Sequence, residues 1–63
     1  MDKKEIFYYD SWFKNTFDFY NKDKSKRLTF TPYYRSDIGK EITVEQAEKE
    51  GCENIEVTDV KNN

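Results

Sequence analysis

Basic side chains are interleaved with tyrosines in the middle of this 63-residue chain, a pattern that could bind an anionic partner. Tyr20 precedes them, and Tyr33 and Tyr34 lie among them. Basic groups can hold phosphates while aromatic rings stack on bases, so the pattern favours a contact with RNA or single-stranded DNA. A lysine-rich loop is more often only a solvated hairpin tip, and that alternative stays open. The predicted anion-contacting residues are Lys22, Lys24, Lys26, Arg27 and Arg35.

The residue types do not favour catalysis or metal binding. The chain has no histidine that could act as a base for its one cysteine, Cys52. A single thiol also cannot build a zinc site. Gly39 and Gly51 are the only glycines, too few for a phosphate-binding loop. We therefore expect a protein that is not an enzyme, with no catalytic residue, metal or cofactor, and with Cys52 in a small apolar site.

All eleven aromatic residues lie between positions 7 and 34. We expect the core to take Phe17, Phe19 and Phe30, with Trp12 and Phe13 as further candidates. More rings remain than a small core needs, although most could be half-buried around a sheet. Exposed tyrosine and tryptophan are typical of protein–protein contacts. The predicted partner-binding residues are Tyr8, Tyr9, Trp12, Tyr20, Tyr33 and Tyr34.

Charge is also segregated along the sequence, although the net charge is only −2. Residues 21–35 hold five basic residues and one acidic residue, whereas residues 38–60 hold two basic and seven acidic residues. Opposite fields influence partners and association rates rather than the fold. The acidic residues fit a solvated outer face, or else they engage a basic surface on a partner.

Two alternating segments, 16–20 and 27–31, predict an antiparallel hairpin around a polar loop. Pairs whose numbers sum to 47 place Phe17 opposite Phe30, which makes one face apolar and the other polar. A slip of one residue would invert both faces, so the pattern favours this register.

Strand-like patterns also occur near both ends of the chain. Residues 54–60 alternate and predict a third strand with Ile55 and Val57 facing inward. Residues 4–14 fit a strand or an irregular arm better than a helix, because aromatic residues are enriched in strands. Residues 61–63 are expected to fray.

A short helix is predicted near residues 44–50. Thr43 and Gln46 have the spacing of a capping box, and Gly51 is suited to end the helix. A helix of two turns is not stable alone, so it must pack against another element.

Together these elements predict one α+β domain, residues 1–63, with a small β-β-α-β arrangement. The antiparallel hairpin is joined by a third strand in the order 2-1-3, with the short helix on one face. A right-handed crossover would make the third strand parallel to the second and place it beside the first. This order leaves the strand before Pro32 at an edge, where a proline is tolerated.

The lone cysteine and the charged start of the chain predict a cytoplasmic protein. No stretch approaches the ~18 apolar residues of a membrane span, so no membrane contact is expected. Because the chain begins with Met1, we expect a complete small gene product.

The hairpin, the run Glu45-Gln46-Ala47-Glu48, and Gly51 followed by an alternating strand resemble small phage-encoded host-takeover proteins, such as the coliphage inhibitor of bacterial RNA polymerase. The resemblance implies a protein that binds and inhibits host machinery in the host bacterial cytoplasm. The aromatic segment 7–13 departs from that pattern, which leaves the target open.

The leading hypothesis is therefore a small non-enzymatic binding protein that modulates a host or cellular macromolecule by protein–protein contact. The alternative is an RNA or single-stranded DNA binding protein that uses the basic loop and exposed rings. A homodimer is compatible with either.

Overall fold

The β2–β3 hairpin forms the middle of the fold in the computed structural model, which describes residues 2–60. β2 (Thr16–Asn21) and β3 (Lys26–Thr31) pair antiparallel, with Phe17 opposite Phe30. The predicted hairpin and its register are confirmed. Apolar side chains of both strands therefore share one face of the sheet.

β1 (Phe7–Phe13) pairs antiparallel with the other edge of β2. Lys14 and Asn15 join the two strands and both have positive φ, 49° and 66°. A two-residue hairpin loop with this backbone matches the twist of the flanking strands. The strand predicted in this region is confirmed, with a register shift between Tyr9 and Ser11.

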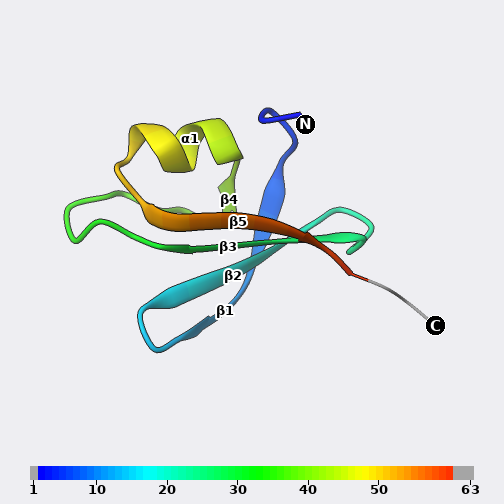
Figure 1. The fold of residues 1–63 in the computed structure, drawn as a ribbon, viewed down its shortest axis with the longest axis horizontal. Helices are drawn as coiled ribbons and strands as arrows, with labels where there is room; N and C mark the ends of the chain where they lie inside the picture. The colour runs from blue at the N-terminus through cyan, green and yellow to red at the C-terminus, as the bar shows by residue number, and fades with distance from the viewer. Residues whose placement is uncertain (1, 61–63) are drawn as a thin grey trace.

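Within the described residues the sheet has five strands in the order β4-β1-β2-β3-β5, where β4 is Glu41–Ile42 and β5 is Glu53–Asp59 (Figure 1). The predicted three-stranded β-β-α-β domain with order 2-1-3 is therefore wrong. β5 cannot lie beside β2, because β1 fills that edge. β5 instead pairs antiparallel with β3, so the crossover rule for parallel strands does not apply. β3 is an inner strand that ends before Pro32.

α1 (Val44–Lys49) lies over one face of the sheet (Figure 1). Its N-cap is the predicted one, since the Thr43 hydroxyl accepts a hydrogen bond from the Gln46 N–H at 3.0 Å. The Gln46 side chain donates to Glu50 at 3.0 Å instead of returning to the cap, so only half of the capping box forms. Gly51 follows the helix with φ of 80°, as a helix-ending glycine should.

The core lies between α1 and the sheet. Val44 and Ala47 face it from the helix. Phe7, which was not among the core candidates, is fully buried, whereas the candidates Trp12 and Phe13 are exposed. The buried apolar residues are Phe7, Phe19, Leu28, Phe30, Ile42, Val44 and Ala47.

β5 contributes a half-buried margin to this core. Ile55 and Val57 pack against it as predicted, and so does Cys52. The frayed tail predicted for residues 61–63 lies outside the described residues.

The helix is too short to cover the whole apolar face. α1 has six residues, and the strand pairing places Tyr9 opposite Phe19 and Trp12 opposite Phe17. Tyr9, Trp12 and Phe17 therefore share a face with the core, but Tyr9 and Trp12 remain exposed. The uncovered part of this face is where a binding surface can lie.

Candidate partner-binding groove

An aromatic groove opens between the β1–β2 hairpin and the loop 32–38. It is open to solvent and has a volume of about 710 Å³. A concave apolar surface of this size can hold several side chains of a partner. The groove is lined by Tyr9, Trp12, Asn15, Phe17, Thr31, Pro32, Tyr33, Tyr34, Ser36 and Ile38.

The sheet side of the groove is a set of packed rings. The Phe17 ring centroid lies 4.5 Å from that of Trp12 and 5.8 Å from that of Tyr9. Phe17 also packs edge-on against Phe19 at 5.9 Å, which links the groove to the core. Rings held by such contacts lose little freedom when a partner covers them, so they suit a binding surface.

The opposite wall is formed by the loop that follows Pro32. The Tyr33 carbonyl accepts hydrogen bonds from the backbone N–H of Ser36 at 2.8 Å and from its hydroxyl at 2.6 Å. The Asp37 N–H donates to the Glu50 carboxylate at 3.2 Å, which ties the loop to the end of α1. These bonds hold the wall in place without a partner.

Tyr33 and Tyr34 form the rim of this wall, with ring centroids 4.7 Å apart. The neighbouring Tyr34 side chain raises the pKa of the Tyr33 phenol. The Arg35 guanidinium lies 5.2 Å from the Tyr34 ring centroid, in reach of a cation–π contact. Tyr34 remains 78% exposed. The loop that carries it is held in place by the hydrogen bonds between Ser36 and the Tyr33 carbonyl.

The groove brings together four of the six predicted partner-binding residues: Tyr9, Trp12, Tyr33 and Tyr34. Tyr8 and Tyr20 do not belong to it. They lie opposite each other in the β1–β2 ladder, one position out of phase with Tyr9, and therefore face the other side of the sheet.

Tyr8 and Tyr20 belong to a row that crosses the open face of the sheet. Tyr20 lies opposite Arg27, which lies opposite Thr58 in β5. Arg27 Nε is buried and has no hydrogen-bond partner among the described residues. Asp18 is on the same face and accepts a hydrogen bond from the Ser11 hydroxyl at 3.2 Å, so the row is flanked by negative charge.

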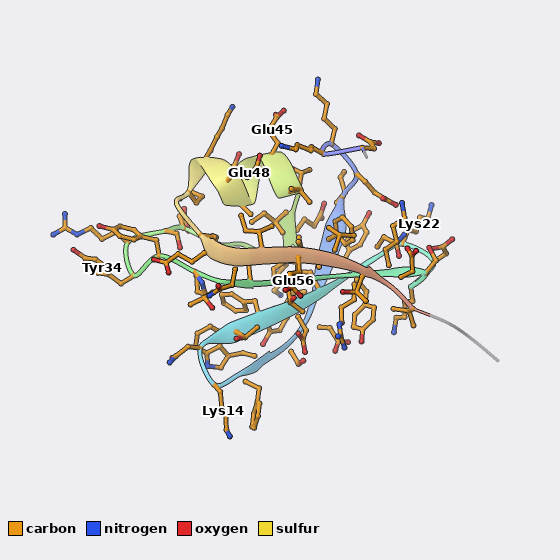
Figure 2. All side chains as sticks on the ribbon, viewed as in Figure 1. Lys14, Lys22, Tyr34, Glu45, Glu48 and Glu56 are labelled. Atoms are coloured by element: carbon orange, nitrogen blue, oxygen red, sulfur yellow. The ribbon has the colours of Figure 1, made fainter. Side chains whose placement is uncertain are left out.

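The predicted basic residues do not form one cluster. Arg35 is beside Tyr34 at one end of the molecule, whereas Lys22 is at the other end (Figure 2). Lys26 Nζ is 3.4 Å from the Glu5 carboxylate in a partly buried ion pair. Only Lys22 and Lys24 are exposed neighbours, and both flank a shallow hollow that Tyr8 and Tyr20 also line.

The loop that carries Lys22 and Lys24 is held by short-range hydrogen bonds. The Ser25 side chain and its N–H, which lies 3.0 Å from the Asp23 carboxylate, lower the pKa of Asp23. Lys24 has a positive φ of 61° and donates its N–H to the Asn21 carbonyl at 3.0 Å. The predicted hairpin loop is thus an ordered turn built without glycine.

The acidic residues of the second half are spread over α1 and β5. Glu45 and Glu48 project from the helix, and Glu56 comes from β5 (Figure 2). Lys3 Nζ lies 3.1 Å from Glu48 in an exposed ion pair, which contributes little to stability. Cys52 follows the helix, and burial raises the pKa of its thiol, so the group is a poor nucleophile.

Some groove residues were missed or misplaced at the sequence level. Phe17 was assigned to the core but is half-buried in the groove, and Ile38 was not singled out. Asn15 was not singled out, although the polar pair Lys14-Asn15 between two aromatic-rich segments could have indicated the β1–β2 turn.

Comparisons of the chain with protein-family models, curated proteins and solved structures gave no match. Within residues 2–60, no helix combines the length and the apolar character that crossing a bilayer requires. The functional assignment therefore depends on the geometry of the groove.

Proposed function

We propose that this chain is a small non-enzymatic binding protein that docks on another protein through the aromatic groove. The observation that carries the proposal is that Tyr9, Trp12 and Tyr34 are exposed on the two sides of a groove, beside a core that is otherwise closed by α1. Aromatic side chains of this kind dominate the energetics of protein interfaces. The intraloop hydrogen bonds of Tyr33 and Ser36 support a preformed site.

We further propose that the partner is a host or cellular macromolecule whose activity is modulated when its surface is occupied, in the cytoplasm of a bacterial host. The pattern-level resemblance to phage-encoded host-takeover proteins supports this part of the proposal. Charge supports it as well, since exposed Lys22 and Lys24 and the glutamates of α1 and β5 form separate basic and acidic areas that can orient a partner during encounter.

A second candidate function is binding of RNA or single-stranded DNA on the open face of the sheet. Its specific support is the row of Tyr8, Tyr20 and Arg27 beside the exposed Lys22 and Lys24. Two rings and three cations in one area can stack bases and hold phosphates. Asp18 and Glu56 on the same face oppose this function, so it ranks second.

Capture from a bacterial lysate at physiological salt, with and without nuclease, separates the two functions. The proposal predicts a stoichiometric protein partner that is retained after nuclease treatment. Capture that disappears with nuclease, falls steeply with salt, and weakens in Lys22→Glu and Lys24→Glu would support the second function instead. Absence of any stoichiometric protein would count against the first.

A further inference from the structure

β5 is the exposed outer strand on one side of the sheet, and no other strand of residues 2–60 pairs with its outer side. The Val60 N–H donates to the Ser25 carbonyl at 2.9 Å. Hydrogen-bonded pairs alternate along an antiparallel ladder, so Val57 and Asp59 direct their N–H and C=O groups away from β3. These groups are free to pair with a further strand.

The two edges of the sheet differ in a way that singles out β5. At the opposite edge β4 has two residues, and very short edge strands are a common protection against unwanted pairing. β5 has seven residues and lacks both proline and lysine, the residues that most often block an edge. Only its first part is distorted, with Asn54 at a φ of 56° beside a register shift.

The charge of β5 determines which strands it can accept. The strand contains Glu53, Glu56 and Asp59 and no basic residue. Two copies paired antiparallel about Glu56 would place Glu56 against itself, and like charges directly opposite are destabilising. A basic strand would instead place a positive charge opposite Glu56. The acidic residues therefore disfavour self-pairing and select for a basic partner.

We propose that β5 is a docking edge that accepts a basic, extended segment of a partner protein as a sixth strand. Val57 and Asp59 would supply the backbone hydrogen bonds, and Glu56 the charge contact. Alternate apolar residues of the incoming strand would cover Ile55 and Val57, which are only half-buried now. This surface is separate from the aromatic groove, and the inference does not depend on the function proposed for the groove.

A fluorescein-labelled peptide of nine residues, alternating lysine and valine, is the probe for this edge. Fluorescence polarisation should show binding that weakens with added salt. A glutamate–valine peptide should not bind. A lysine–valine peptide with N-methyl groups on alternate amides should not bind either, because it keeps its charge but loses the donors for β5. Equal binding of all three peptides, or no binding by the first, would overturn the proposal.

In Glu56→Lys, the affinity for the lysine–valine peptide should fall by about three- to tenfold, because an attractive cross-strand pair becomes repulsive. Glu45→Lys makes the same change on α1 and should bind as the unmodified protein does. Equal losses in both variants would mean that only the net charge matters, and the docking edge would be rejected.

Backbone pairing is tested at Asp59, whose N–H points away from β3. Asp59→Pro removes this donor and should lose binding, whereas Asp59→Asn removes only the charge and should retain most of it. Amide hydrogen exchange should slow at Val57 and Asp59 when the peptide is added. Slowing at these amides in concentrated protein without peptide would indicate a second copy at the edge, and slowing confined to the groove would indicate another site. Either result overturns the proposal.

Discussion

Phe19 shows how much of the fold depends on single side chains. Its ring is fully buried and lies 5.5 Å from the Phe30 ring and 5.8 Å from the Tyr9 ring, measured between centroids. It therefore belongs both to the core and to the support of the groove. Phe13, six positions earlier, is 67% exposed and supports neither.

Phe19→Ala should cost about 3–5 kcal/mol of unfolding free energy, because it removes a buried ring and leaves a cavity. A domain of this size has only about 3–5 kcal/mol to lose, so the variant should be largely unfolded at 25 °C. Circular dichroism with a urea titration measures this. Phe13→Ala is the control and should change stability by less than about 0.5 kcal/mol. Similar losses in both variants would contradict the assigned core.

The two glycines should respond differently to substitution by alanine. Gly51 has φ of +80°, whereas an added methyl group at Gly39 would meet no atom within 4 Å. Gly51→Ala should destabilise the protein by about 1 kcal/mol, since the left-handed backbone is costly for alanine. Gly39→Ala should be neutral or stabilising by about 0.4–1 kcal/mol. Thermal melts of both variants test this, and the reverse order would contradict the helix end assigned here.

The turns between strands determined which strand pairings could be predicted from the sequence. The β2–β3 register was predictable because Phe17, Phe19, Leu28 and Phe30 make one face apolar only in that pairing. β1 was recognised as a strand, but its pairing was missed because the turn Lys14-Asn15 lacks glycine. Once β1 occupies the edge of β2, β5 cannot pair there, so missing this one turn led to the wrong position for the third strand.

Substitution at this turn tests its role. Asn15→Gly should stabilise the protein by up to about 1 kcal/mol, because glycine accepts the positive φ that a side chain resists. Asn15→Ala should destabilise the protein, because alanine tolerates the positive φ at this position less well than asparagine does. Chemical denaturation of the pair gives the comparison. If both substitutions shift stability in the same direction, the turn does not constrain the hairpin as described.

At the scale of the whole molecule, the site was predicted only in part. Tyrosines were correctly expected at the surface in Tyr8, Tyr9, Tyr33 and Tyr34, whereas Trp12 had been a candidate for both the core and the surface and is exposed. The convergence of Tyr9, Trp12, Tyr33 and Tyr34 on one groove could not be predicted, because it requires the loop after Pro32 to cross the uncovered end of the sheet toward β4. The same topology separates Arg35 from Lys22, which a linear reading had placed in one basic region.

The proposed function requires that exposed rings in the groove bind a protein partner. Trp12 and Phe13 are adjacent in the sequence and both exposed, but only Trp12 lines the groove. The most direct test is therefore capture of a nuclease-resistant protein partner by Trp12→Ala and Phe13→Ala side by side. Capture should fall at least about tenfold in Trp12→Ala, as expected for a ring that anchors an interface, and should be unchanged in Phe13→Ala. Equal capture by both variants would contradict the claim.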